Sequence, residues 1–348
     1  MKQFNIIGLM SGTSLDGLDI VYVNFKLDKY WKYEIINSKT YKYEKKWNSF
    51  LQKISKEKIN SIIKIDKDYT KLLSKYIINF INEFSIKDID FISSHGHTAL
   101  HQPSKSLTYQ IGNLPILAKY INQKVVCDFR VQDVELGGQG APLVPVGEEY
   151  LFSEYNTLIN LGGFANITKR IKNNISAYDI CPINIVFNHL SRMIKLKYDD
   201  GGHIASTGKI NRDLYNNLQI LNYYNQDPPK SLGIEWVNDE IHSILKNFQN
   251  IPIKDLMNTF SNHFAFQIAN NIGDQDKVLI TGGGAYNDYL IDRIKKLTNS
   301  KITIPDSKIV EYKEALIFSF LGLLRVHKIN NCYSMLPCDS FNLRVFQN

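Results

Sequence analysis

Hydrophobic and polar residues along the chain form short segments that predict a mixed α/β fold. Apolar, β-branched runs at 4–10 and 19–25 predict two strands, and a turn-rich stretch joins them. Because this connection is short, we expect the two strands to pair as an antiparallel hairpin. Apolar residues recur at helical spacing over 69–84. The other elements expected in this part are a strand at 33–38, a strand at 88–93, a helix at 113–121 and a strand at 124–128.

The second part of the chain shows a similar succession. Strands are expected at 156–161 and 164–169, with Gly162 and Gly163 between them. The other elements expected here are strands at 175–178, 277–281 and 301–304, and helices at 183–196, 253–272, 286–297 and 312–326. Each part therefore opens with a hairpin turned on a glycine-containing loop. This pattern predicts duplicated α/β domains around a cleft, although no residue-level repeat is visible.

Composition narrows the class of protein. The chain has 348 residues, enough for two domains, and its 44% hydrophobic and 22% charged residues are typical of a globular protein. No segment reaches the roughly 20 uncharged apolar residues that a membrane span needs. The formal charge of +7 comes from interspersed lysines and acids, without a recognisable nucleic-acid-binding module. The four cysteines lack metal-binding spacing, which favours free thiols. We therefore expect a cytoplasmic protein that binds neither membranes nor nucleic acids.

Three glycine-rich loops could hold a phosphate group, at 10–17, 161–167 and 281–285. Glycine lets the backbone turn tightly, so that its N–H groups converge on an anion. Asp16 and Asp19 lie at the first loop, where a carboxylate could bind Mg²⁺. An ordinary tight turn is the alternative interpretation of each loop. No Walker A motif and no strand–GxGxxG–helix unit occurs, so nucleotide phosphates between two hairpin loops are the favoured interpretation.

Three charged residues near expected strand ends or helix starts are candidates for chemistry. Asp179 could act as a general base, or it could simply cap a helix or a turn. Arg130 is suited to bidentate contact with a carboxylate or phosphate, unless it is a surface residue paired with Asp128 or Asp133. Glu314 is placed at the start of the last expected helix, where an acidic residue also favours the helix dipole.

Segments spread from residue 8 to residue 321 resemble the motifs of the anhydro-N-acetylmuramic acid kinase family. The most specific are GLMSGTSLDGLD at 8–19 and GGQGAP at 137–142. The others are SHGHT at 94–98, QIG at 110–112, DFR at 128–130, NLGGFANI at 160–167, PPKS at 228–231, TGGGAYN at 281–287 and KEALIFSFL at 313–321.

This resemblance implies an actin/hexokinase/Hsp70-type sugar kinase. Its fold would be α/β, with two duplicated actin-like ATPase (ribonuclease H-like) domains whose mixed sheets flank an interdomain cleft. We expect domain I at 1–135 plus 310–348, with the first phosphate loop and the sugar contacts. Domain II is expected at 136–309, with the second phosphate loop and the adenosine-side glycine loop.

The resemblance also implies an activity and its residues. Such enzymes use ATP and Mg²⁺ to open the 1,6-anhydro bond of 1,6-anhydro-N-acetylmuramic acid and to phosphorylate O6, a step of murein recycling; the family also implies a homodimer. Asp179 would be the base that activates water, and His97, Thr98, Arg130 and Glu314 would line the sugar site. ATP would be held by Gly12, Thr13, Ser14, Leu15, Asp16, Gly17, Leu18, Asp19, Gly162, Gly163, Asn166, Gly282, Gly283 and Gly284. Mg²⁺ would be bound through the ATP phosphates, with Asp16 or Asp19 as a candidate ligand.

Two segments differ from the family pattern. Residues 179–184 read Asp-Ile-Cys-Pro-Ile-Asn where the family has Asp-Thr-Gly-Pro-Gly-Asn, and residues 331–338 replace a Ser-Val-Thr-Gly-Ala stretch. Two alternatives therefore stay open beside the anhydro-sugar kinase. One is a kinase of the same fold that acts on another sugar or sugar acid, and the other is a non-catalytic sugar or nucleotide sensor.

Overall fold

The chain divides into two compact units in a computed structural model, which describes residues 2–12, 15, 17–102, 107–171, 174–332 and 345–346. Unit 1 comprises residues 1–153 and 312–348, and unit 2 comprises residues 154–311. The stretch 136–153, which we expected in the second domain, therefore belongs to unit 1. It is held there by a buried ion pair in which Lys313 Nζ lies 2.9 Å from Glu148 Oε1.

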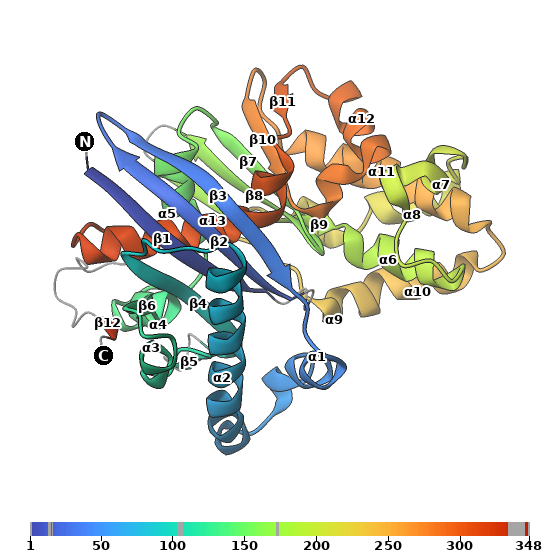
Figure 1. Cartoon of the computed structure of the whole chain (residues 1–348). Helices are drawn as coiled ribbons and strands as arrows, with labels where there is room; N and C mark the ends of the chain where they lie inside the picture. The colour runs from blue at the N-terminus through green and yellow to red at the C-terminus, as the bar shows by residue number, and fades with distance from the viewer. Residues whose placement is uncertain are drawn as a thin grey trace. The chain divides into compact units, whose positions relative to one another are not determined.

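The sheet of unit 1 has the strand order β12-β6-β4-β1-β2-β3, with β5 paired to β4 (Figure 1). Its strands are β1 (Lys2–Ser11), β2 (Leu18–Leu27), β3 (Trp31–Tyr41), β4 (Phe91–Gln102), β5 (Leu107–Ile111), β6 (Val125–Cys127) and β12 (Val345–Phe346). β1 and β2 are antiparallel, with Met10 opposite Asp19, which confirms the expected hairpin. β4 runs parallel to β1 and to β6.

The sheet of unit 2 repeats this topology. Its order is β11-β10-β7-β8-β9, from strands β7 (Thr157–Leu161), β8 (Phe164–Ile171), β9 (Asn174–Pro182), β10 (Lys277–Thr281) and β11 (Lys301–Thr303). β7, β8 and β9 form an antiparallel meander as β1, β2 and β3 do, and β10 and β11 continue the sheet in parallel as β4 and β6 do. The predicted α/β fold with two duplicated, mixed sheets is thereby confirmed.

Helices cover both faces of the unit 1 sheet (Figure 1). They are α1 (Lys45–Leu51), α2 (Ile59–Glu83), α3 (Ile116–Ile121), α4 (Phe129–Glu135), α5 (Val144–Leu151) and the unit 1 part of α13 (Ser307–Val326). Ile7 and Leu9 of β1 are fully buried in one cluster with Leu73 and Ile77 of α2. On the opposite face, a Cβ on Gly8 would lie only 2.4 Å from the Ala315 carbonyl oxygen of α13. Only glycine allows this close approach.

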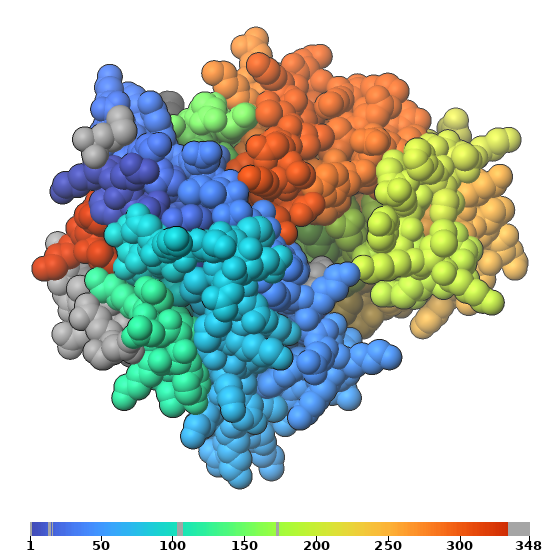
Figure 2. All heavy atoms as spheres, viewed as in Figure 1, coloured from blue at the N-terminus to red at the C-terminus, as the bar shows by residue number. Residues whose placement is uncertain are grey.

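α2 presents a polar outer face. Lys64, Lys67, Lys71 and Lys75 are exposed along it, so the lysine-rich first third of the chain is a solvated surface here. The segment of α2 lies at the surface of unit 1 (Figure 2). No helix among the described residues is long and apolar enough to cross a lipid bilayer.

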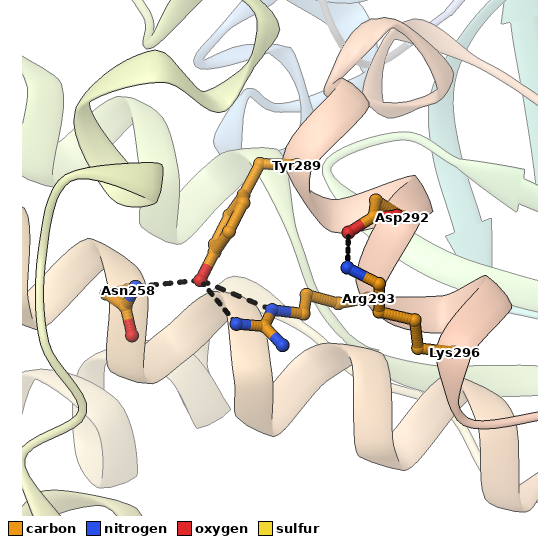
Figure 3. A network of polar contacts seen from close by, with 5 residues as sticks. All are labelled: Asn258, Tyr289, Asp292, Arg293 and Lys296. Carbon is orange, nitrogen blue, oxygen red and sulfur yellow. Dashed lines mark hydrogen bonds and ion pairs between the residues drawn. The ribbon is translucent and has the colours of Figure 1, made fainter.

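The helices of unit 2 surround a second core. They are α6 (Asn184–Met193), α7 (His203–Ser206), α8 (Arg212–Gln219), α9 (Ile234–Trp236), α10 (His242–Leu245), α11 (Ile253–Asn270) and α12 (Asp288–Lys296), with a short turn η7 (Gly283–Tyr286) before α12. Asn258 of α11 donates to the Tyr289 hydroxyl at 2.8 Å, and Arg293 donates to the same oxygen twice at 3.3 Å (Figure 3). Asn258 also donates to the Ala205 carbonyl at 2.9 Å. These bonds fix α12, which follows the third glycine loop.

Two elements extend beyond the expected bounds, and both carry candidate residues. β4 continues to Gln102, so His97 and Thr98 lie inside a strand, whereas the expected strand ended at residue 93. α13 begins at Ser307, so Glu314 lies two turns inside the helix and not at its start. The helix dipole therefore does not account for Glu314.

Candidate active site

Two buried histidines lie on β4 of unit 1. His95 Nδ1 lies 2.9 Å from the Gly96 carbonyl oxygen, and His95 Nε2 lies 3.5 Å from Arg130 Nη2. Burial, with the charge of Arg130 nearby, lowers the pKa of His95 to about 3, so its imidazole is neutral at pH 7. A carbonyl only accepts hydrogen bonds, so Nδ1 carries the proton and Nε2 accepts from Arg130.

Arg130 is oriented by the glycine loop that follows α4. Its Nη1 donates to the Gly140 carbonyl at 2.7 Å, while the Gly140 N–H donates to Asp133 Oδ2 at 2.6 Å. Gly138 packs so closely on Asp133 that a Cβ would lie 2.2 Å from its carboxylate. The Nε N–H of Arg130 is buried and has no hydrogen-bond partner among the described residues. Arg130 is thus a half-buried cation with donor capacity left for a ligand, and not an exposed surface residue.

Glu314 completes the charged group in unit 1. Burial is the largest influence on its pKa and raises it. The charge of Lys313 lowers this pKa, the charge of Glu148 raises it, and the charge of Arg130 lowers it. Burial lowers the pKa of Arg130, and Asp133 and Glu314 oppose that shift. Arg130 and Glu314 therefore influence each other, and the structure brings them together in unit 1. Thr98 is half-buried on β4.

The first glycine-rich loop connects β1 and β2. Thr13, Ser14 and Asp16 lie outside the described residues. A Cβ on Gly17 would lie 2.5 Å from the Tyr41 carbonyl oxygen, so this position requires glycine. Asp19 lies in β2, and its Oδ1 accepts a hydrogen bond from Thr40 Oγ1 at 2.6 Å. Gly12 and Leu15 belong to the loop itself, whereas Leu18 is the first residue of β2.

Asp179 lies within β9, the edge strand of the unit 2 sheet. Its Oδ2 accepts a hydrogen bond from the Leu232 N–H at 2.9 Å, and its carbonyl accepts one from the Tyr223 hydroxyl at 2.6 Å. α6 begins after Ile183, so Asp179 is not the N-cap of that helix. Burial raises the pKa of Asp179, and the Leu232 N–H opposes this rise. Oδ1 has no hydrogen-bond partner among the described residues. A half-buried carboxylate held by one oxygen, with the other available, suits a general base.

The second and third glycine loops lie side by side in unit 2. β7 and β10 are parallel neighbours, with Asn160 opposite Thr281, so both loops follow the carboxyl ends of adjacent strands. Gly282 has φ +82°, and a Cβ there would lie 2.6 Å from Asn160 Oδ1. A Cβ on Gly284 would lie 2.7 Å from Leu161 Cβ. Ligands of open α/β sheets bind at such strand ends.

Gly163 and Gly283 stand apart because their neighbours do not require glycine. A Cβ on Gly163 would meet no atom within 4 Å, and one on Gly283 would meet only Asn184 Nδ2, at 3.9 Å. Neither has a positive φ. Gly163 is exposed, as is Asn166, which pairs with Asp179 across β8 and β9. Bare backbone that faces open space can approach a bound phosphate closely.

Several supporting residues escaped the sequence analysis. Around Asp179, Tyr223 and Leu232 come from a segment more than forty positions away. Its Lys230 carbonyl accepts the Asp179 N–H at 3.3 Å, and the PPKS motif at 228–231 was the available signal. In unit 1, Ser11 contacts His97 Nδ1 at 2.9 Å, and no local pattern pointed to this pair.

A metal held only by protein side chains finds no support in the described part of the chain. No group of three or more His, Cys, Asp or Glu residues is placed there to bind one. Asp19 remains a carboxylate beside the first loop, and carboxylate oxygen is a ligand that Mg²⁺ prefers.

Comparisons with known proteins cover nearly the whole chain. Residues 4–336 match the sequence profile of the family "Anhydro-N-acetylmuramic acid kinase". The chain is 33% identical to the protein of that name from Sulfurimonas denitrificans, over 94% of each chain. It is 34% identical to the one from Clostridioides difficile, over 94% of this chain and 93% of the relative. Among solved structures, the activator of 2-hydroxyisocaproyl-CoA dehydratase from Clostridium difficile, with bound ADPNP, aligns at a TM-score of 0.47 and 14% identity, covering 95% of this chain and all (100%) of that one.

Proposed function

The chain belongs to the anhydro-N-acetylmuramic acid kinase family, and we propose that Asp179 of unit 2 and the Arg130–Glu314 group of unit 1 carry its reaction. The enzyme uses ATP to open the 1,6-anhydro bond of 1,6-anhydro-N-acetylmuramic acid and to phosphorylate O6, giving N-acetylmuramic acid 6-phosphate and ADP. The observation that supports the assignment of the base is the Asp179 carboxylate, anchored through Oδ2 with Oδ1 left available.

In the proposed reaction Asp179 takes a proton from a water molecule, whose oxygen bonds to C1 as the C1–O6 bond breaks. O6 bonds to the γ-phosphorus as the bond from phosphorus to the ADP oxygen breaks. Arg130, Glu314, His97 and Thr98 line the sugar site. Arg130 suits this role because guanidinium N–H groups remain beyond those used by Gly140 and His95. Phosphoryl transfer depends mainly on such positioning and on charge neutralisation.

ATP is proposed to lie along the three glycine loops, at Gly12–Asp19, Gly162–Asn166 and Gly282–Gly284. Mg²⁺ would be held by the ATP phosphates and by Asp19 or Asp16, and would neutralise phosphate charge. We place the enzyme in the cytoplasm because ATP is its co-substrate. We also propose a homodimer, as the family resemblance implies, and sedimentation equilibrium would test it.

Turnover tests the function directly. We expect ADP release with Mg-ATP and 1,6-anhydro-N-acetylmuramic acid, and none with N-acetylmuramic acid or N-acetylglucosamine. The altered segment 179–184 lies beside the base, so turnover on the anhydro sugar would show that this segment is tolerated. Turnover on another sugar only, by folded protein that binds ATP, would point to the same-fold kinase of different specificity. ATP binding without turnover on any sugar would favour the sensor.

Replacing Gly163 and Gly282 by alanine distinguishes a glycine needed for ATP binding from one needed for stability. Gly163→Ala is expected to raise the KM for ATP at least about tenfold, because the methyl group fills the space that a phosphate would approach. Its melting temperature should stay within about 2 °C of the wild type, because the new Cβ meets no neighbour. Steady-state kinetics and thermal melting measure both effects.

Gly282→Ala is the matched comparison. Its positive φ and its contact with Asn160 predict a loss of about 1–3 kcal/mol of stability. An unchanged KM for ATP in Gly163→Ala would remove the 162–163 loop from the ATP site.

A further inference from the structure

Behind His97, three hydroxyl groups form a closed buried triangle. Ser11 Oγ lies 2.6 Å from the Tyr43 hydroxyl oxygen and 3.1 Å from that of Tyr69, and the two tyrosine oxygens lie 2.7 Å apart. Ser11 Oγ also lies 2.9 Å from His97 Nδ1. Ser11, Tyr43, Tyr69 and His97 are all buried. They come from β1, the segment after β3, α2 and β4, so only the fold brings them together.

Counting protons determines the direction of each hydrogen bond. Tyr69 donates its hydroxyl proton to Ser11, so this proton cannot serve the contact with Tyr43. Tyr43 must then donate to Tyr69, and Ser11 must donate to Tyr43. All three hydroxyl protons are now used. The fourth contact, between Ser11 Oγ and His97, therefore needs a proton from Nδ1.

The ionisation of these groups is consistent with this count. Burial raises the pKa of Tyr43 to about 12, and it also raises the pKa of Tyr69. Both hydroxyls therefore keep their protons near neutral pH. Burial lowers the pKa of His97 to about 4, although a hydrogen bond to the Ser11 backbone opposes this shift, so its ring carries a single N–H. With that proton on Nδ1, both Ser11 contacts fall on the Nδ1 side, and Nε2 is a lone pair that no side chain among the described residues contacts.

We propose that Ser11, Tyr43 and Tyr69 are positioning residues that hold His97 as the Nδ1–H tautomer, so that Nε2 accepts a hydrogen bond from the sugar. This inference rests on the proposed placement of His97 at the sugar. 1,6-Anhydro-N-acetylmuramic acid offers two neutral donors, the C4 hydroxyl and the acetamido N–H. An acceptor at Nε2 selects for such a donor, whereas the opposite tautomer would present an N–H and favour an acceptor. The triangle therefore sets which sugars this part of the site accepts.

Tyr43→Phe tests the proposal because it changes the proton count. Without the Tyr43 hydroxyl, Tyr69 still donates to Ser11, and the Ser11 proton is free for Nδ1. The Nε2–H tautomer then satisfies every remaining contact. Two-bond ¹H–¹⁵N spectra of ¹⁵N-histidine-labelled protein without ligand, with His97 assigned from a His97→Asn spectrum, should show Nδ1–H in the wild type and a shift to Nε2–H in Tyr43→Phe. The KM for the sugar should rise about tenfold, and the KM for ATP should not change.

Tyr22→Phe is the matched control. It also removes one tyrosine hydroxyl of the same buried cluster, but that hydroxyl donates to the Asp88 carbonyl at 2.8 Å and does not contact His97. It should leave the tautomer and both KM values unchanged. Tyr69→Phe opens the triangle at another corner and serves if Tyr43→Phe does not fold.

Each outcome of these experiments is informative. A wild-type His97 with its proton on Nε2 would overturn the proton count, whatever the enzyme acts on. The expected tautomer shift with an unchanged KM for the sugar would overturn the role of Nε2 as an acceptor. A 4-deoxy sugar identifies the donor: if the C4 hydroxyl bonds to Nε2, Tyr43→Phe should lose its effect on this analogue, and a persisting effect would assign the acetamido N–H. Failure of the proposed function would instead appear as wild-type protein inactive on the anhydro sugar, with the tautomer as expected.

Discussion

Replacing Asp179 by asparagine is expected to lower kcat about 10³-fold, because the amide cannot take a proton from water. The asparagine Oδ1 can still accept the Leu232 N–H, so the loop at 223–232 should stay in place. Burial raises the pKa of the native carboxyl, so the charged form carries a desolvation cost at pH 7. The variant should therefore be at least as stable as the wild type at that pH. Coupled ADP release, ATP titration and thermal melting measure these quantities.

The pH dependence of kcat/KM is an independent test of Asp179 as the base. Asp179 must be deprotonated to act as a base, so activity should fall as the pH drops through its pKa. Because that pKa is raised above 3.8, the acidic limb of kcat/KM should lie at higher pH than an ordinary aspartate would give. Asp179→Asn should lose this limb. Asp255→Asn, which alters a carboxylate bonded to the Lys209 N–H, is the control and should keep full activity. Undiminished turnover by Asp179→Asn would show that another group activates the water.

Replacing Arg130 by lysine is expected to lower kcat/KM for the sugar about 100-fold, while the KM for ATP changes little. The guanidinium donates to the Gly140 carbonyl and to His95 and still has N–H groups for a ligand. An ammonium group is a compact point charge that cannot reach all these partners from one position. The charge that Asp133 and Glu314 face is retained, so a loss in Arg130→Lys reports geometry more than charge.

A comparison of two sugars, with and without the lactyl carboxylate, tests which part of the sugar Arg130 contacts. If it binds the lactyl carboxylate, wild type and Arg130→Lys should differ much less on 1,6-anhydro-N-acetylglucosamine, which lacks that group. An equal loss on both sugars would place Arg130 at the phosphoryl group or at the sugar ring. Wild-type kinetics in Arg130→Lys on both sugars would exclude Arg130 from the sugar site.

The strands that carry apolar runs were predictable, and the polar end of β4 was not. Residues 4–10 and 19–25 show β-branched and apolar runs because β1 and β2 are buried in the sheet. At His95 and His97 the run becomes polar, which is typical of a loop. The strand nevertheless continues because these side chains bond to Gly96 and Ser11 instead of water. Short helices such as α4 and α5 also escaped prediction, because seven or eight residues show little periodicity.

The residues of the candidate site also fall into those that the sequence predicts and those that it does not. Asp179, Arg130 and Glu314 could be named from the sequence because each lies in or beside a segment that resembles family motifs, and their roles stay predictions. Their partners could not be named. Leu232 reaches Asp179 across 53 positions, and Ser11 reaches His97 across 86. Such pairs depend on tertiary packing, which no local propensity encodes.

The discontinuous make-up of unit 1 has a consequence for synthesis on the ribosome. The part of α13 that packs against Gly8 belongs to a segment that follows the whole of unit 2. At about 5–20 residues per second, unit 2 takes about 8–30 s to translate, which is long compared with the folding of a small domain. During that time one face of the first sheet lacks α13 on the nascent chain, while unit 2 is contiguous and can fold as it emerges. The first-made half of this kinase is therefore the last to be completed.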